Sequence, residues 1–195
     1  KRIDEFSSIL CDKDDGRLFE EMVFCFFTGG CSAKMGLNSV DAVRHLLENG
    51  THEELATALV GHHRYPNARS RYIVHTREYL KNAYSMRIFD RLDSFADPIE
   101  RRDWLVKDKG IKGLGYKEAS HYLRNIGYKG YAILDKHVLN CLYELKIIDS
   151  PIPPKTRSVY LKTEQSVKRL SKRTGIDFDE LDLVLWSMKT GTILK

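Results

Sequence analysis

The most informative stretch of the chain reads Ile111-Lys112-Gly113-Leu114-Gly115-Tyr116-Lys117-Glu118-Ala119. The residues before it, 98–108, favour a helix, and a second helix is predicted over 116–126. Two glycines that flank one apolar residue favour a tight hairpin whose backbone is not covered by side chains. We expect Ile111 and Leu114 to point back between the two helices and to anchor the bend.

The bend has the features of an anion site. The helix that begins near Tyr116 presents its first N–H groups and its positive dipole end beside exposed glycine amides. A DNA phosphate can approach such a backbone closely, and this contact reads no sequence. We therefore interpret the stretch as a helix-hairpin-helix motif in which Gly113 and Gly115 bind a phosphate. The alternative is a glycine-rich turn between two core helices, but the anchors and the small Ala119 favour the DNA interpretation.

Two titratable residues could carry chemistry beside this bend. The position of Lys117 alone favours a plain phosphate-binding lysine over a nucleophile, which would need help to lose its proton. Asp135 follows 18 residues later, at the start of a predicted helix. The helix between them climbs ~15 Å, and the extended residues after it can span at most ~26–29 Å. The chain can therefore bring Asp135 back to face Lys117, and Asp135 can also cap its own helix.

The whole chain is predicted to be helical. The predicted helices cover 2–10, 17–27, 33–48, 51–60, 67–82, 86–95, 98–108, 116–126, 135–146, 155–174 and 178–189. Thr51 with Glu54 forms a capping box. Helices are expected to end in left-handed conformation at Gly50, Gly127, Gly175 and Gly191. Only Tyr131–Leu134 carries a strand signal, and it is short.

We predict an all-α fold of two helical subdomains with the active site in the cleft between them. The first domain would be contiguous over 17–131 and would end with the hairpin. The second would join 1–16 to 132–195. Lys117 and Asp135 would then come from opposite sides of the cleft.

Composition excludes several classes of protein. With 195 residues, 42% of them hydrophobic and 10% aromatic, the chain is not disordered. No apolar run approaches the ~18 residues that a membrane span needs. The four cysteines (Cys11, Cys25, Cys31 and Cys141) are scattered, which is typical of reduced intracellular thiols and excludes an iron–sulfur cluster.

The charge of the chain is unevenly distributed. The formal net charge is +5, and residues 151–175 hold seven Lys or Arg against one acid. Residues 97–130 hold eight basic residues against five acids. Two basic stretches indicate a surface that meets polyanions, although a solvated helix face would have the same charge.

The motif Gly113-x-Gly115-x-Lys117-x-Ala119, followed by Asp135-x-His137, resembles the helix-hairpin-helix DNA glycosylase superfamily. The lysine marks its bifunctional members, which are glycosylases with AP lyase activity. The segment 111–139 resembles most closely the archaeal type 2 8-oxoguanine DNA glycosylases. The stretch Phe24–Ala33 and the ending Leu181-Asp182-Leu183…Trp186…Thr190-Gly191…Leu194-Lys195 resemble the same group. Two features depart from the superfamily: Lys112 replaces its usual Pro, and the stretch before the Asp is poor in Gly and Pro.

The resemblance implies a reaction in base excision repair. Lys117 would attack C1′ of the sugar of a flipped 8-oxoguanine nucleotide, and Asp135 would assist. The resulting Schiff base would permit β-elimination, which nicks the strand. His137 would contact a phosphate beside the lesion, although from sequence alone a solvent-facing histidine fits equally well.

The pocket for the oxidised base is expected in the last helix and the tail. Asp182 and Trp186 are four residues apart and share a face, distinct from a predicted core stripe of Leu181, Val184, Leu185 and Met188. A tryptophan beside a carboxylate suits a purine, although Trp186 could equally belong to the core. By the resemblance, the terminal carboxylate of Lys195 reads the N7–H of 8-oxoguanine.

Two further elements are expected near the site. The segment Gly61-His62-His63-Arg64-Tyr65-Pro66 could probe the gap left by the flipped base, with Tyr65 stacking on the lesion, although a plain loop is slightly favoured. The backbone carbonyls of Lys109, Ile111 and Leu114 match positions where relatives hold a monovalent cation. That cation would be structural, and no cofactor is expected to be required. A zinc site at the two adjacent histidines is not expected.

Three other functions remain open from sequence. One is an endonuclease III-like glycosylase for oxidised pyrimidines, against which the missing cluster cysteines argue. Another is an adenine glycosylase, which would not normally carry Lys117. The third is a non-catalytic helix-hairpin-helix DNA-binding module. The expected partner is duplex DNA containing 8-oxoguanine, bound by a monomer in the cytoplasm or nucleoid, with no membrane contact.

Overall fold

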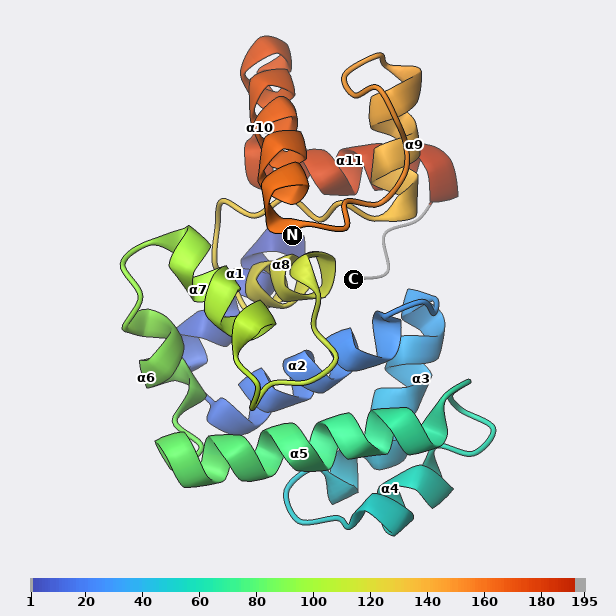
Figure 1. The fold of residues 1–195 in the computed structure, drawn as a ribbon, viewed down its shortest axis with the longest axis vertical. Coiled ribbons are helices and arrows are strands. Elements are labelled where there is room, and N and C mark those ends of the chain that lie inside the picture. The colour runs from blue at the N-terminus through green and yellow to red at the C-terminus, as the bar shows by residue number, and fades with distance from the viewer. Residues whose placement is uncertain (1, 192–195) are drawn as a thin grey trace. The chain divides into compact units, whose positions relative to one another are not determined.

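The computed structural model describes residues 2–191, which are all-α with no strand among them. The chain divides into two compact units, residues 1–127 and 128–195, here called the N-terminal unit and the C-terminal unit (Figure 1). No helix in the described part of the chain is both long and apolar enough to cross a membrane.

The N-terminal unit holds eight α-helices and one short 3₁₀ helix among its described residues. They are α1 (Arg2–Asp12), α2 (Asp15–Thr28), α3 (Ala33–Val43), η1 (Arg44–Leu46), α4 (His52–Ala58), α5 (Pro66–Tyr84), α6 (Ile88–Asp93), α7 (Pro98–Lys107) and α8 (Tyr116–Asn125). Helix α2 forms the centre, because α3, α5, α6 and α8 all pack against it. Its residues from Met22 to Phe27 are no more than 1% exposed, which is typical of a helix that is apolar all round.

Local signals set most helix ends as predicted. Thr51 and Glu54 form the expected capping box at the start of α4. Gly127, Gly175 and Gly191 take the left-handed conformation. The prediction is wrong for Gly50, whose φ is not positive. A Cβ there would lie 2.7 Å from the carbonyl oxygen of Leu46, so close backbone approach, not handedness, requires glycine.

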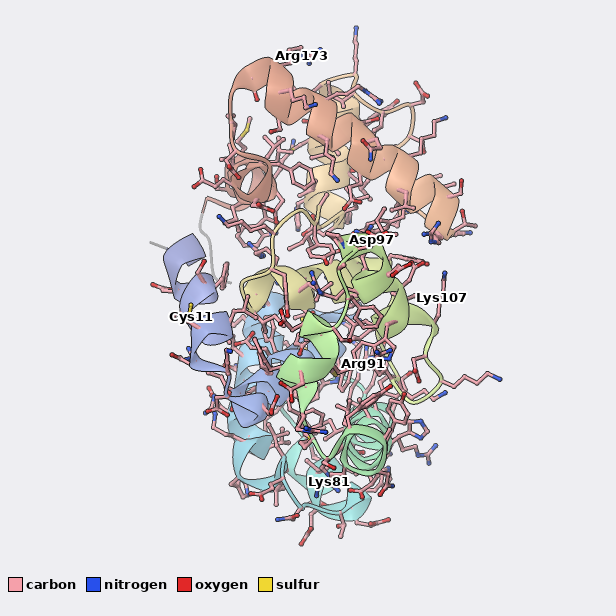
Figure 2. The ribbon with its side chains drawn as sticks, turned by 90° about the vertical axis from the view of Figure 1, so that its left-hand side faces the viewer. Cys11, Lys81, Arg91, Asp97, Lys107 and Arg173 are labelled. Atoms are coloured by element: carbon pink, nitrogen blue, oxygen red, sulfur yellow. The ribbon has the colours of Figure 1, made fainter. Side chains whose placement is uncertain are left out.

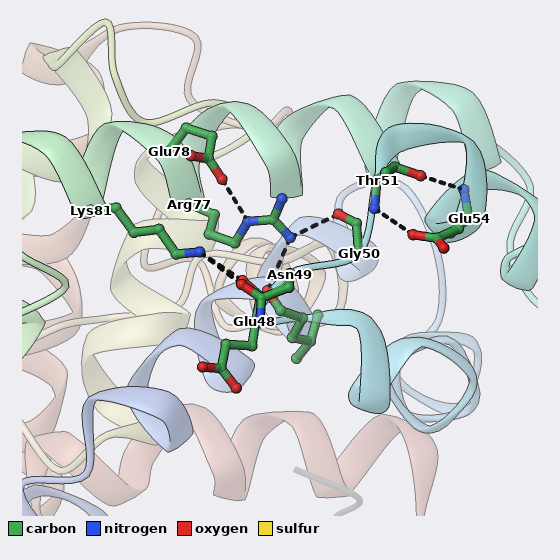
Figure 3. A network of polar contacts seen from close by, with 9 residues as sticks. Glu48, Asn49, Gly50, Thr51, Glu54, Arg77, Glu78 and Lys81 are labelled. Atoms are coloured by element: carbon green, nitrogen blue, oxygen red, sulfur yellow. Dashed lines mark hydrogen bonds and ion pairs between the residues drawn. The ribbon is translucent and has the colours of Figure 1, made fainter.

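A buried arginine ties α5 to the segment before α4 (Figure 3). Arg77 is 4% exposed, and its Nη1 donates to the carbonyl oxygens of Leu47 and Gly50 at 3.3 and 2.9 Å. Its Nε donates to Glu78 at 2.9 Å. The guanidinium thereby satisfies carbonyls that a short loop would otherwise leave unpaired. This contact fixes the far side of α5, the helix that supports the predicted hairpin.

The C-terminal unit consists of an extended segment and three helices, α9 (Lys136–Glu144), α10 (Arg157–Thr174) and α11 (Phe178–Thr190). Residues Tyr131–Leu134 are buried, as the apolar run predicts, yet they form no strand. Side chains of α10 pair their backbone: Glu164 accepts from Ala132 N at 2.9 Å, and Tyr160 OH donates to Ala132 O at 2.7 Å. The Tyr160 hydroxyl also accepts from Leu134 N at 3.4 Å.

We expect Tyr160→Phe to lower the free energy of unfolding by about 1–3 kcal/mol, because it leaves two buried backbone groups without a partner. Urea denaturation followed by circular dichroism measures this change. Tyr143→Phe is the matched control, since Tyr143 is 49% exposed and should change stability little. Equal effects of the two variants would contradict the role given to the Tyr160 hydroxyl.

The N-terminal helix packs within the N-terminal unit. Arg124 of α8 lies over the ring of Phe6, 4.7 Å from its centroid, and Gly127 abuts the backbone of Phe6 and Ser7. The domains predicted from the sequence instead join 1–16 to 132–195, and the first of them ends at residue 131. That grouping stays a prediction, as does a cleft between the subdomains.

Candidate nucleic-acid interface and active site

Helices α7 and α8 and the bend between them form the predicted hairpin. Ile111 and Leu114 are 5% and 8% exposed and Ala119 is fully buried, so the two anchors and the small contact residue are confirmed. Across the two helices, Arg102 donates to the Ser120 hydroxyl at 3.1 Å. Gly115 is the N-cap residue of α8 and makes no side-chain capping hydrogen bond. This end of α8 is therefore suited to an external anion.

A stripe of α5 that was not predicted from the sequence supports the bend. His75 Nε2 lies 3.1 Å from the Lys109 carbonyl oxygen, and Tyr79 OH donates to Asp108 at 2.7 Å. The ring of Tyr72 lies where a Cβ on Gly113 would be, at 2.5 Å, while Tyr79 covers Gly110 in the same way. Burial raises the pKa of Tyr79, and hydrogen bonds to Tyr84 and Asp108 raise it further, so this phenol keeps the proton that it donates.

The departure from the superfamily at Lys112 has a structural reason. The backbone N–H of Lys112 donates to the Thr76 hydroxyl at 3.1 Å. Proline has no N–H and could not make this bond. The residues at 72, 75, 76 and 79 follow helical spacing, so Thr76 belongs to the same supporting stripe of α5.

Lys117 lies in the first turn of α8, two residues after Gly115. Its side chain is 25% exposed, and its Nζ lies 4.0 Å from a carboxylate oxygen of Glu118, whose side chain is 19% exposed. The other Glu118 oxygen lies 3.1 Å from where a Cβ on Gly115 would be. Glu118 therefore places its carboxylate beside both Gly115 and the Lys117 amine. That Glu118 follows Lys117 in the sequence did not by itself predict this contact.

Asp135 caps helix α9. One of its oxygens accepts from the Val138 N–H at 2.8 Å, so the capping role is confirmed. The second oxygen has no partner among the described residues, and the side chain is half-buried. Asp135 follows directly after the buried segment 131–134, and this segment fixes where α9 begins. That Asp135 faces Lys117 stays a prediction.

The C-terminal unit brings two predicted residues together. The rings of His137 and Trp186 meet edge to face, with centroids 6.2 Å apart. His137 is exposed and Trp186 is partly exposed, so Trp186 is not an ordinary core residue. Asp182 lies one turn before Trp186 and is 6% exposed. These three residues form one edge of α9 and α11, although their roles in DNA and base recognition remain predictions.

The predicted core stripe of α11 is wrong in part. Leu181 and Leu185 are buried, but Val184 is 37% and Met188 68% exposed. Leu183 and Asp182 are buried instead, so the helix is rotated relative to the face that hydrophobicity alone selected. Lys195, the predicted reader of the oxidised base, lies outside the described residues.

The loop before α5 presents an aromatic ring between two arginines. Tyr65 is 46% exposed, with the guanidinium carbons of Arg64 and Arg69 at 6.0 and 5.8 Å from its ring centroid. Buried His63 holds the loop, because its Nε2 lies 3.1 Å from the Phe27 carbonyl oxygen and its Nδ1 accepts from Tyr65 N at 2.9 Å. This pattern assigns the proton to Nε2. Tyr65 can therefore offer a π-face to a base, the contact predicted for it.

Acid should loosen this loop. Burial lowers the pKa of His63, the nearby cations of Arg69 and Arg64 lower it further, and the bond to Phe27 opposes them. Since the folded-state pKa lies below the unfolded value of about 6.5, the stability from neutral His63 is present above that value and is lost as pH falls. We expect amide exchange over 61–66 to accelerate at acidic pH beyond its intrinsic change. His62→Gln should keep this response and His63→Gln should remove it; a response that survives in His63→Gln would contradict the assignment.

The three backbone carbonyls predicted to hold a cation have different surroundings. The Lys109 carbonyl is within hydrogen-bond distance of His75, whereas those of Ile111 and Leu114 accept no hydrogen bond from the described residues. Hard carbonyl oxygens suit a monovalent cation, so the donor set fits in kind. Among residues 2–191, no group of three or more His, Cys, Asp or Glu could hold a metal ion.

Helices α7 and α8 and their glycine bend define a helix-hairpin-helix protein, a class whose bend grips a nucleic-acid phosphate. The family model described as 8-oxoguanine DNA glycosylase matches residues 1–176. The chain is 40% identical over 196 residues to the 8-oxoguanine DNA glycosylase/AP lyase of Korarchaeum cryptofilum, covering 100% of this chain and 89% of that protein. The chain therefore belongs to the 8-oxoguanine DNA glycosylase family.

Solved structures agree with this assignment. One is the Methanocaldococcus jannaschii 8-oxoguanine glycosylase/lyase in complex with DNA containing 8-oxoguanine. The chain is similar to it with a TM-score of 0.89 and 36% identity, over 100% of this chain and 90% of that one. The Thermotoga maritima 8-oxoguanine DNA glycosylase gives a TM-score of 0.88 at 32% identity, over 100% and 89% of the two chains.

Proposed function

We propose that this protein excises 8-oxoguanine from duplex DNA and then nicks the strand at the resulting site. The observation that carries the proposal is Lys117 in the first turn of α8, directly after an uncapped glycine bend. A phosphate held at Gly113 and Gly115 would bring the backbone of the damaged strand beside the amine. The family of the chain and the names of its relatives support the same substrate and the same two activities.

The reaction requires the damaged nucleotide to leave the stack, at a cost of a few kcal/mol. The Lys117 Nζ would form a bond to C1′ while the bond from C1′ to N9 of the base breaks, and the amine proton would pass to a carboxylate. The carboxylate would pass this proton to the departing base, which then leaves in its neutral form. Loss of the sugar ring oxygen from C1′ would leave an imine, which acidifies C2′. Removal of that C2′ proton would expel the 3′ phosphate by β-elimination.

Asp135 is the carboxylate that we assign to this proton and to the positive charge that develops on the sugar. Its capping bond uses one oxygen and leaves the other available. His137 would contact the next phosphate, and Trp186, Asp182 and Lys195 would meet the base. Tyr65 would stack in or beside the gap. A monovalent cation at the bend carbonyls would be structural.

Asp135→Asn separates capping from catalysis, because asparagine caps a helix as well as aspartate does. We expect the melting temperature to stay nearly unchanged and single-turnover base release to fall about a hundredfold. Rapid-quench kinetics and thermal melting measure the two effects. A rate equal to that of the wild type would remove Asp135 from the reaction, whereas loss of both stability and rate would leave only its capping role.

A panel of duplexes tests the proposed function. Each duplex carries one lesion, and sodium borohydride is added to reduce any imine to a stable adduct. An adduct with 8-oxoguanine supports the proposal. An adduct only with an oxidised pyrimidine would indicate an endonuclease III-like enzyme. Release of adenine without an adduct would indicate an adenine glycosylase. Binding without any reaction would indicate a non-catalytic module. Light scattering tests whether the protein is the expected monomer. The proposed substrate implies an intracellular location on the nucleoid.

A further inference from the structure

The C-terminal unit has a basic hollow that the proposed reaction does not use. It has a volume of about 370 Å³ and lies between the end of α9 and the last turns of α10. Three cationic side chains, one hydroxyl and two apolar side chains line it: Lys146, Arg169, Arg173, Ser166, Ile147 and Leu170. Figure 2 places Arg173 at the C-terminal end of α10.

The three cations of this basic hollow are not neutralised. Lys146, Arg169 and Arg173 are exposed, and no ion pair joins any of them to an acid within residues 2–191. Arg169 Nη2 donates to the Ser166 hydroxyl at 2.8 Å, which orients the guanidinium. Arg169 and Arg173 are four residues apart on α10 and so share a face. The hollow therefore presents a concentrated positive charge with one oriented guanidinium.

Lys146 occupies a backbone position that favours glycine. Its φ is +56°, in the left-handed region. Its N–H donates to Tyr143 O at 2.9 Å and Ile147 N–H donates to Leu142 O at 2.8 Å, the Schellman pattern that usually carries glycine. A lysine there is strained, because its Cβ lies close to the following carbonyl oxygen in the left-handed conformation. The Lys146 side chain nevertheless lines the hollow beside Arg169 and Arg173.

We propose that the basic hollow binds the phosphate backbone of the DNA that flanks the lesion. This inference rests on the proposed function for the identity of the polyanion. Asp135 precedes α9 and Lys146 follows it, and a helix of nine residues is about 14 Å long. The hollow therefore lies at the opposite end of α9 from Asp135. It would be a DNA contact distinct from the one proposed for Asp135.

The variant Lys146→Gly/Arg169→Gln/Arg173→Gln tests the proposal by binding alone. The probe is lesion-free duplex DNA of two or three helical turns, with affinity measured by fluorescence anisotropy over a range of salt concentrations. Each lost phosphate contact should reduce the slope of log affinity against log salt by about 0.9. We expect the slope to fall by about 2 to 3, and to fall less on a duplex shorter than one turn.

Single variants separate charge from backbone strain. Lys13 has the same left-handed conformation, with φ +51°, and lies in the N-terminal unit outside the hollow. Lys13→Gly therefore removes one charge and one strained lysine, as Lys146→Gly does. We expect only Lys146→Gly to weaken DNA binding, while its melting temperature does not fall.

Three outcomes would overturn the proposal. A triple variant with an unchanged salt slope would show that the hollow touches no phosphate. Loss of polyglutamate binding with DNA binding intact would indicate an acidic protein partner instead. Lower stability of Lys146→Gly with unchanged DNA affinity would assign the lysine to the dipole of α9. Because the probe carries no lesion, failure of the excision reaction would leave this measurement intact.

Discussion

Lys117→Gln should give no borohydride-trapped adduct with an 8-oxoguanine duplex. Glutamine keeps a polar side chain of similar length but has no nucleophilic amine, so strand nicking should slow by about a thousandfold or more. Any base that is still released would be displaced by water and would leave an abasic site without a nick. Denaturing gel electrophoresis, with and without alkali, distinguishes these products. Affinity for the damaged duplex should fall little, since one cation is lost.

Lys107→Gln is the matched control for this experiment. Lys107 is an exposed lysine of α7 (Figure 2). It pairs with Asp103 at 2.7 Å. The control should form the adduct at the wild-type yield. If Lys117→Gln forms it at that yield too, another amine is the nucleophile and the proposed mechanism is wrong.

Gly113→Ala should cause the largest loss of stability among the hairpin variants. Its φ of +80° disfavours any side chain, and a Cβ would meet the ring of Tyr72 at 2.5 Å. The conformational cost is about 1–2 kcal/mol, and overpacking adds about 1–3 kcal/mol. We expect the free energy of unfolding to fall by about 2–5 kcal/mol and duplex binding to fall with it, because the same backbone holds the phosphate.

Two further variants divide this cost into its parts. Gly175 has φ +73° with no atom within 4 Å of an added Cβ, so Gly175→Ala carries the conformational cost without the clash. Tyr72→Ala in combination with Gly113→Ala opens space and should recover part of the overpacking term. Equal losses for Gly113→Ala and Gly175→Ala, measured by urea denaturation, would show that the Tyr72 contact does not constrain the bend.

The helices could be located from the sequence because cap residues and glycines mark their ends. The helix predicted over 98–108 is Pro98–Lys107, and that over 178–189 is Phe178–Thr190. Cap residues and glycine stops act within one turn of the chain, so a single sequence contains them. The helix predicted over 33–48 fails for a related reason. In the structure this segment consists of α3 followed by the short 3₁₀ helix η1. No residue pattern predicts this change from α-helix to the tighter 3₁₀ helix.

The candidate site was predictable only where its residues are neighbours in sequence. The bend, its anchors and the capping role of Asp135 follow from short spacings. The residues of the α5 stripe lie 29 and 34 residues before the bend residues that they contact, and its aromatic residues look like an ordinary helix face. The burial of Asp182 beside exposed Val184 was also missed, because hydrophobicity selects a helix face only when the partner surface is apolar.

The hydrogen bond between the Lys112 N–H and the Thr76 hydroxyl couples two positions that are 36 residues apart in the chain. A relative with proline at the position of Lys112 has no donor to offer, so its residue corresponding to Thr76 gains nothing from a hydroxyl and is free to become apolar. A family member that keeps a donor at the first position should keep serine or threonine at the second. Repair enzymes of this kind would thus have two interchangeable ways to restrict the motion of the bend. One is a proline in the bend, and the other is a hydrogen bond from the bend to a hydroxyl of the supporting helix.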